Sequence, residues 1–521
     1  MRDLGEFFSS TFSDHAGGRS GRTAGGHRGG RAETERGDGD MTLVRSDVRQ
    51  GTAWSGRTAT LPVLDPAPDA AIHRTTAATA SNGKVLHGLR PWLPLLVALA
   101  WMLGTFGAFW LGGQADEVPD PARLCLFVLS ATTVFALGYV ARIVLRPPQA
   151  RPADDTPQRM RRIHRLVFWG AWYYAALGAA LLLEYGANSP GDILRSIMDP
   201  ADSYASKFAI YQAQQDSGRV SLPIQVLTLL AVLSTATVPL LAVHWRGLTP
   251  RLKTTALLGI SVYIVFFLYI GTLKGLGDTV VMALAGLMVA SVARLRIRRR
   301  RPTRRGVLVA VVLLAVFGWY MVGNQAARVS LFGTQDVMRA NPAVARVVGN
   351  EAATGVAATI FYPTHGYLGL AYNLETPFEW SRGLGANPAV ASYAGQYLKA
   401  DVTEHPPYPT RTEARTGYPA GLYWSTAYPW LASDLTFPGV VALMGLLGWF
   451  LARFWTEAAY HREILPTLIF AQLALVIAYL PANNQLGASR PGLIGLVTLA
   501  VLYAATRVNR RARALRSAEP T

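Results

Sequence analysis

The feature that most constrains this chain is the way its apolar residues are grouped along the sequence. They gather in blocks of roughly 20 residues, about the length that a helix needs to cross the hydrocarbon core of a bilayer. No block carries a charged residue in its middle. The ten blocks are residues 92–112, 123–145, 166–184, 224–243, 255–272, 279–293, 306–322, 438–452, 464–480 and 491–506. The sequence therefore predicts an all-α, polytopic membrane protein with about ten transmembrane helices.

The positive charges indicate the orientation of these helices. The formal net charge is +18, and arginine supplies most of the positive charge because the chain has only five lysines. A basic chain can bind nucleic acid, but here the arginines lie beside apolar blocks, as in the cytosolic segments of membrane proteins. The arginine-rich connections are residues 146–165, 244–253, 294–305 and 453–462, followed by the tail 507–516. Their alternation with arginine-poor segments predicts a cell-membrane protein with both termini in the cytoplasm and no nucleic-acid partner.

This threading divides the chain into five parts. Residues 1–88 are rich in Gly, Arg, Thr and Ser and have no long apolar run, so we expect a disordered cytoplasmic tail, with Met1 or Met41 as its start. The other parts are residues 89–322 with seven spans, a large extracytoplasmic loop at 323–437, residues 438–506 with three spans, and a basic cytoplasmic tail at 507–521.

One apolar segment of the large loop, residues 352–371, is long enough to be taken for an eleventh span. A full crossing there would place the C-terminal arginines outside the cell. The segment also contains Pro363 and His365. We therefore expect a helix that lies at the interface or dips into the protein from outside, where protein or water shields its backbone.

The large loop is where we expect function, because loops held by a rigid scaffold often carry binding and catalytic residues. Its many aromatic side chains suit either the membrane interface or the apolar faces of sugar rings. It also contains six arginines, although the charge bias disfavours arginine on this side. These arginines favour an anionic ligand.

Two shorter outer segments add further candidates. Residues 185–223 contain Tyr204 and Lys207. Lys274 lies between two spans, where it is either an interfacial snorkelling lysine or a phosphate contact beside the free N–H groups of a helix start. We expect Asp278 to cap that helix. Cys125 is the only cysteine, so the chain forms no intrachain disulfide.

Several outer stretches are similar to motifs of a known family. Residues 362–370 read Tyr-Pro-Thr-His-Gly-Tyr-Leu-Gly-Leu and are followed by Pro-Phe-Glu-Trp at 377–380 and Gly-Leu-Gly at 383–385. Residues 424–439 include Trp-Ser-Thr-Ala-Tyr and Asp-Leu-Thr-Phe-Pro-Gly, and residues 271–275 read Gly-Thr-Leu-Lys-Gly. Over residues 90–510 the chain resembles the bacterial oligosaccharide repeat-unit polymerases, the Wzy-like O-antigen polymerases.

The resemblance implies a metal-independent, inverting glycosyl transfer outside the membrane, without a cofactor. A polyprenyl-diphosphate-linked oligosaccharide donates its chain, and a second lipid-linked repeat unit supplies the accepting hydroxyl. The partners implied are these lipid-linked glycans, the bilayer and a chain-length regulator. Cations must then hold the diphosphate, and a base must accept the proton of the hydroxyl.

Candidate residues for these roles come from the outer segments. We expect Lys274, Arg328 and Arg382 to bind the diphosphate, with Arg411 or Arg415 behind them. His365 is the candidate catalytic base, and Glu375, Glu379 and Asp434 are alternatives to it. The candidate glycan-binding residues are Tyr362, Tyr367, Trp380 and Trp424. No spacing of His, Asp and Glu indicates a metal site.

Three other functions remain open at this point. An O-antigen ligase-type glycan transferase would share the spans, the large loop and the donor, and differ only in its acceptor. A transferase that uses polyprenyl-phosphate monosaccharides would need an acidic pair in the first outer loop, where Asp116 and Glu117 lie. A lipid-linked glycan flippase or other transporter would place ionisable or broken-helix sites near the midplane, but the middles of these spans are uncharged.

Overall fold

The computed structural model describes residues 88–516, apart from gaps at 112–113, 150–155, 201, 205, 208–209, 211–220, 295–317, 330–341, 402, 421–422, 485–486 and 488. Residues 1–87 of the predicted tail 1–88 and most of the predicted span 306–322 lie outside these residues. The described part of the chain is built from helices, and its one β interaction is an isolated bridge between Thr426 and Asn483.

Seven of the described helices are long and apolar enough to cross a membrane, as expected for a multi-pass membrane protein. They are α2 (Leu93–Leu111, extended by the short helix η2 at Arg90–Trp92), α3 (Pro121–Leu145), α4 (Pro157–Glu184), α9 (Pro250–Tyr269), α10 (Lys274–Arg294), α17 (Tyr428–Ala459) and α20 (Arg490–Arg516). Three of these helices begin in the same way. Asp120, Thr156 and Thr249 each accept a hydrogen bond from the backbone N–H three residues on, and proline follows each of them.

Three predicted spans differ from a single long helix. The block 224–243 forms α7 (Leu222–Leu229) and α8 (Val232–His244), which are bent by 55° at the break between them. The block 464–480 forms α18 (Ile464–Tyr479), which has 16 residues. Helix α17 is broken at Thr436, which has a positive φ of 64° just before Pro438, so the predicted span 438–452 begins after this break.

The helices of the large loop are all shorter. They are α12 (Pro342–Val348), α13 (Asn350–Thr364), α14 (Gly366–Leu374), α15 (Pro388–Leu398) and α16 (Tyr408–Thr416). The apolar segment 352–371 is thus divided at His365 between α13, with 15 residues, and α14, with 9 residues. Each is shorter than a full crossing requires.

Small residues allow the long helices to pack closely. A Cβ atom on Gly138 of α3 would lie 2.0 Å from the Gly445 carbonyl oxygen of α17, and one on Gly448 would lie 2.0 Å from the Phe135 carbonyl oxygen. Gly259 of α9 approaches the backbone of Ala171 of α4 in the same way. Such contacts are typical of helix pairs in membranes, where close approach of backbones replaces the hydrophobic effect as the cause of association.

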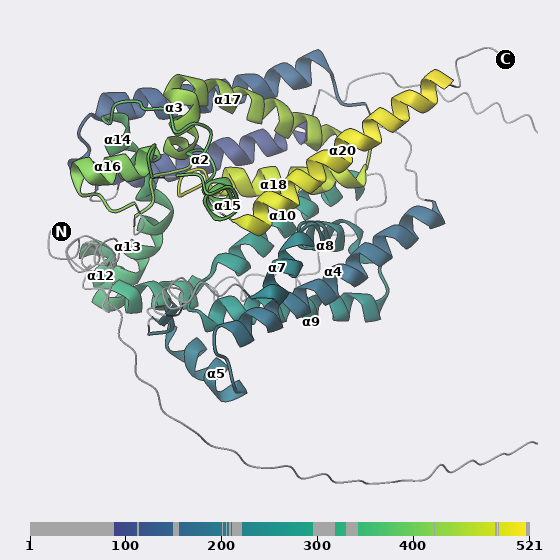
Figure 1. Cartoon of the computed structure of the whole chain (residues 1–521), viewed down its shortest axis with the longest axis horizontal. Coiled ribbons are helices and arrows are strands. Elements are labelled where there is room, and N and C mark those ends of the chain that lie inside the picture. Colours follow the sequence, from purple (N-terminus) through teal and green to yellow (C-terminus); the bar gives the residue numbers. More distant parts are fainter. Residues whose placement is uncertain are drawn as a thin grey trace, which may run out of the picture. The chain divides into compact units, whose positions relative to one another are not determined.

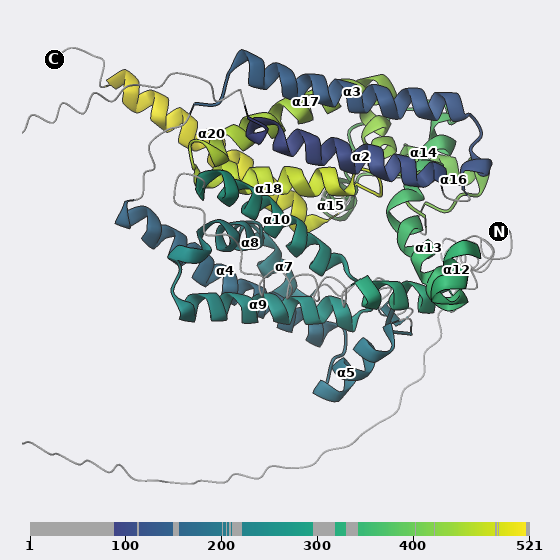
Figure 2. The same cartoon turned by 180° about the vertical axis from the view of Figure 1, so that it is seen from behind.

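The connections gather at two opposite ends of the bundle. Figures 1 and 2 show α12, α13, α14 and α16 together at one end, and the C-terminal part of α20 at the other. At the first end, which we call the loop end, Arg123 forms an ion pair of 3.1 Å with Glu375. At the second, the arginine end, Arg510 forms an ion pair of 2.8 Å with Glu463, and Arg159 donates a hydrogen bond to the Arg462 carbonyl oxygen.

Candidate functional site

The turn between α9 and α10 positions the residues of the candidate site at the loop end. Gly271 has a positive φ of 63°, which glycine adopts readily. A Cβ atom there would lie 2.4 Å from the Pro200 carbonyl oxygen and 2.8 Å from the Tyr204 backbone nitrogen. The turn therefore holds the segment around Tyr204 closely, and Lys274 follows as the first residue of α10.

Three cationic side chains meet beside this turn. Arg328, from the helical segment 318–329, donates a hydrogen bond to the Gly271 carbonyl oxygen, and its guanidinium carbon lies 4.0 Å from the Tyr204 ring centroid. The Lys207 Nζ atom lies 5.3 Å from the same centroid. Burial lowers the pKa of Lys207 to about 8, and the positive charges of Arg328 and Lys274 act in the same direction. We call Lys207, Lys274 and Arg328 the cationic cluster.

Asp278 is the carboxylate that contacts this cluster. Its Oδ2 atom lies 2.8 Å from Lys274 Nζ, and its Oδ1 atom accepts a hydrogen bond of 2.6 Å from the Tyr479 hydroxyl. The prediction that Asp278 caps the helix is wrong, because α10 begins four residues earlier and Asp278 pairs along the helix instead.

The arrangement is suited to a multiply charged anion. The positive charges of Arg328 and Lys274 both act on Lys207, and Asp278 forms an ion pair with Lys274. The Arg328 Nε atom is buried and has no hydrogen-bond partner among the described residues. A buried guanidinium N–H without a partner is costly, and a diphosphate oxygen would satisfy it with a charge-assisted hydrogen bond.

Aromatic rings adjoin the cationic cluster on the side of α13. Tyr362 interacts electrostatically with Arg328, and its ring centroid lies 4.5 Å from that of Trp424. Trp424 in turn stacks on His365, with centroids 5.3 Å apart and an interplanar angle of 26°. Tyr362 is 39% exposed, so part of its ring is open to a ligand. The structure thus brings together five predicted site residues: Lys274, Arg328, Tyr362, His365 and Trp424.

The geometry argues against the predicted role of His365 as a catalytic base. Its Nδ1 atom lies 3.0 Å from the Phe361 carbonyl oxygen, which can only accept, so Nδ1 carries the hydrogen. Its Nε2 atom then accepts a hydrogen bond of 3.0 Å from the Trp424 backbone N–H. Burial lowers the pKa of His365 to about 4. The ring is therefore neutral, and both of its nitrogens are occupied by backbone groups.

His365 instead belongs to a joint between the two short helices and the rest of the loop end. A Cβ atom on Gly366 would lie 2.3 Å from the Pro481 carbonyl oxygen, and one on Gly369 would lie 2.6 Å from the Trp424 carbonyl oxygen. Residues 365–369, which read His-Gly-Tyr-Leu-Gly, thus pack α14 directly against two backbone segments. This packing explains the spacing of the motif without a catalytic role.

The remaining predicted residues lie outside the cluster. Arg382 is exposed and forms an ion pair of 3.7 Å with Glu404, away from the other cations. Trp380 is 58% exposed. Tyr367 is 1% exposed, and its hydroxyl interacts with Thr105 at 3.1 Å. Tyr367 is therefore a core residue, which argues against its predicted role in glycan binding.

The alternative bases are also occupied elsewhere. Glu375 pairs with Arg123, and Glu379 lies 4.0 Å from Arg411. Asp434 accepts hydrogen bonds from the Gly383 and Ala386 backbone N–H groups at 2.8 and 2.7 Å. It thereby fixes the turn in which Arg382 and Gly383 adopt positive φ. The segments 383–386 and 434–439 are thus joined to each other.

Sequence reasoning named Lys207 only within the outer segment 185–223 and expected Asp278 to cap a helix, so it assigned neither residue to the diphosphate site. A signal for Lys207 was present, because lysine is rare in this chain and Lys207 shares with Lys274 a place in an arginine-poor segment. Among the described residues, no three His, Cys, Asp or Glu side chains are grouped as a metal site would require. Comparisons of the chain with protein-family models, with curated proteins and with solved structures found no match.

Proposed function

We propose that this chain is a membrane glycosyltransferase of the oligosaccharide repeat-unit polymerase type, acting on polyprenyl-diphosphate-linked glycans at the outer face of the cytoplasmic membrane. The main support is the meeting of Lys207, Lys274 and Arg328 beside the exposed ring of Tyr362. In this proposal the chain has about ten spans and two cytosolic termini. The cluster lies at the loop end, opposite the arginine-rich connections, and the positive-inside rule assigns that end to the outside.

The proposed reaction transfers a glycan between two lipid-linked substrates. The acceptor hydroxyl oxygen forms a bond to the anomeric carbon of the donor glycan, and the bond from that carbon to the diphosphate oxygen breaks. The electron pair of the broken bond remains on the diphosphate. Lys274 and Arg328 stabilise this growing negative charge, as preformed cations do at other transition states.

Asp278 replaces His365 as the proposed base for the accepting hydroxyl. Its carboxylate lies beside Lys274. Each of its two oxygens accepts one hydrogen bond and keeps a second lone pair. The proton of the hydroxyl passes to this carboxylate as the new bond forms. Tyr362 and Trp424 offer ring faces to the sugar, which presents C–H patches between its hydroxyls.

The direct test is chain elongation by the purified full-length protein in lipid nanodiscs. The substrate is a synthetic polyprenyl-diphosphate-linked oligosaccharide, and the products are resolved by mass spectrometry. Arg328→Ala should lower the rate of elongation by about 10²–10³-fold, because a donor to the developing charge is lost. Lys274→Ala should act in the same direction.

Arg382→Ala is the matched control for Arg328→Ala. Both arginines belong to the same long segment, but Arg382 is exposed and pairs only with Glu404 among the described residues. Its loss should change the rate by about twofold at most, since exposed ion pairs contribute little. Equal rates for Arg328→Ala and Arg382→Ala, with both proteins monodisperse, would rule out the proposed diphosphate site.

One observation favours a transporter instead. Helices α7 and α8 form a bent pair with an angle of 55°, and transporters use broken helices to build their substrate sites. The same purified protein, reconstituted into liposomes, allows transport to be distinguished from polymerisation. Movement of a fluorescent lipid-linked glycan across the bilayer without longer products would support transport and contradict the polymerase.

A further inference from the structure

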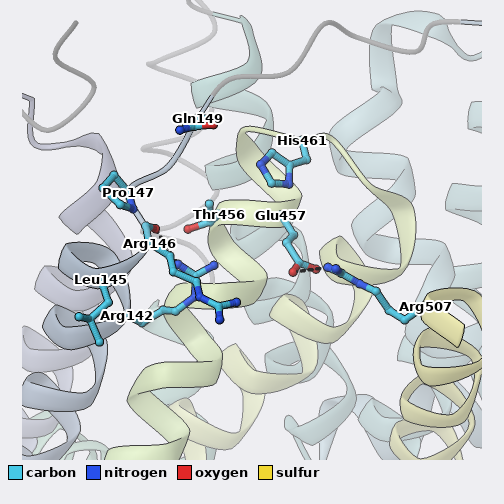
Figure 3. Close-up of a pocket in the computed structure, with 9 residues that line it drawn as sticks. All are labelled: Arg142, Leu145, Arg146, Pro147, Gln149, Thr456, Glu457, His461 and Arg507. Carbon is cyan, nitrogen blue, oxygen red and sulfur yellow. Dashed lines mark hydrogen bonds and ion pairs between the residues drawn. The ribbon is translucent and has the colours of Figure 1, made fainter. Parts of the chain in front are cut away.

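A second polar site lies at the arginine end, far along the helices from the cationic cluster. Helices α3, α17 and α20 contribute residues to a pocket of about 450 Å³, shown in Figure 3. The residues that line this pocket include Arg142, Arg146, Gln149, Glu457 and Arg507. Among the described residues, three guanidinium groups and one carboxylate thus line the pocket.

That carboxylate is already occupied. Glu457 is 5% exposed, and its Oε1 atom forms ion pairs with Arg453 and Arg507. Its Oε2 atom accepts a hydrogen bond of 2.7 Å from the Tyr503 hydroxyl. The dashed line in Figure 3 joins Glu457 to Arg507, whereas Arg142 and Arg146 lie on the other side of the pocket. The charge of Glu457 also acts on Arg142, but the ion pairs of Glu457 among the described residues are with Arg453 and Arg507.

Arg142 and Arg146 supply further positive charge, which is buried at Arg142 and exposed at Arg146. Arg142 is 8% exposed, and its Nη1 atom donates a hydrogen bond of 2.7 Å to the Arg146 carbonyl oxygen. The ion pairs among the described residues include neither arginine. The Arg507 Nε atom is also buried and has no hydrogen-bond partner among the described residues. Burying a guanidinium without an anionic partner costs free energy, so an anion in the pocket would stabilise this arrangement.

We propose that this pocket binds a phosphate group. Guanidinium groups match phosphate oxygens with paired hydrogen bonds, and the pocket offers several such groups around one cavity. The phosphate could come from an acidic phospholipid headgroup or from a soluble phosphate compound. Leu145 lines the same pocket and is 69% exposed, which provides an apolar contact for an acyl chain. The positive-inside rule places this end at the cytosolic leaflet, which carries anionic lipids.

The test measures lipid binding to the purified full-length chain by native mass spectrometry. Phosphatidylglycerol is compared with phosphatidylcholine, which has a phosphate but no net charge. The wild type should retain phosphatidylglycerol about tenfold more tightly or better, as expected for charged hydrogen bonds. The double variant Arg142→Gln, Arg146→Gln should lose this preference.

The control is Arg251→Gln, which removes one positive charge at the same end from an exposed position on α9. It should keep the preference. Gln149→Glu adds a negative charge at an exposed position of the rim and removes no arginine. It should weaken phosphatidylglycerol binding even if the double variant does not fold.

A parallel equilibrium dialysis with radiolabelled inorganic phosphate identifies the source of the ligand. Saturable binding that the double variant loses would assign the pocket to soluble phosphates, and phosphatidylglycerol binding alone would assign it to the headgroup. A wild type that neither prefers phosphatidylglycerol nor binds inorganic phosphate would overturn the proposal. Unchanged affinities in Gln149→Glu would also overturn it.

Discussion

Lys207 is the residue through which pH should act on the cationic cluster. Its pKa lies at about 8, below the usual 10.5, mainly because burial disfavours the charged form and also because Arg328 and Lys274 repel it. The amine is therefore charged at neutral pH and loses its proton as the pH rises through about 8. A bound diphosphate would favour the charged form and raise this pKa. Affinity for the anion should then fall over the range in which free Lys207 deprotonates.

The expected outcome is a loss of about tenfold in affinity for inorganic pyrophosphate between about pH 7 and about pH 9.5, corresponding to one lost charged contact. Calorimetric titration of the purified chain measures it. Lys207→Arg is the reference, because arginine stays protonated throughout. Pyrophosphate gains charge over this range, so the ratio of the two Kd values isolates the lysine. A constant ratio would show that Lys207 does not face the anion.

At this scale, the sequence predicted positions better than roles. Lys274 and Arg328 were recognisable because cations are unexpected in outer segments, and the structure brings them together. The same signal also selected Arg382, which lies apart from them. His365 shows why this happens. The role of a histidine depends on what its two nitrogens meet, and the Phe361 carbonyl oxygen and the Trp424 N–H come into place only through the tertiary fold.

At the scale of elements, hydropathy predicted where helices lie but not where they break. The breaks at α7–α8, at Thr436 and at His365 all fall inside or beside apolar blocks. Apolar composition is equally compatible with one long helix and with two short ones. The breaks matter for function, because the one at His365 places Tyr362 on α13 beside Arg328 while α14 packs into the loop end.

The joint at Gly366 gives a test of this element. In Gly366→Ala the added Cβ atom would lie 2.3 Å from the Pro481 carbonyl oxygen, so the backbone must move. We expect a loss of stability of roughly 1–3 kcal/mol, typical of overpacking. It would be measured as a lower midpoint of thermal unfolding of the detergent-purified chain. Gly104→Ala is the control, since Gly104 lies within α2 and has no atom within 4 Å of its added Cβ. Equal midpoints in the two variants would contradict the packing argument.

At the scale of the whole molecule, charge and packing give the same division into two ends. The arginine-rich connections around Arg159, Arg462 and Arg510 contact one another at the arginine end. The outer segments that were predicted from arginine scarcity contact one another at the loop end, through pairs such as Arg123 with Glu375. If an odd number of spans separated two arginine-rich connections, these connections would lie at opposite ends of the bundle. The packing alone does not identify the cytosolic end, and the positive-inside rule predicts that it is the arginine end.

Accessibility of single cysteines tests this orientation directly. Cys125 is the only native cysteine, so Cys125→Ala gives a thiol-free background. Lys399→Cys then places a thiol at an exposed position of the loop end, and Asn509→Cys places one at an exposed position of the arginine end. A membrane-impermeant thiol reagent should label position 399 in intact spheroplasts and position 509 only after lysis. The cationic cluster can meet a lipid-linked glycan at the outer face only with this pattern. The reverse pattern would mean that the arginine end faces outward and the loop end faces the cytosol. The pocket of Arg142 and Arg146 would then face outward, and the cluster of Lys274 and Arg328 would not.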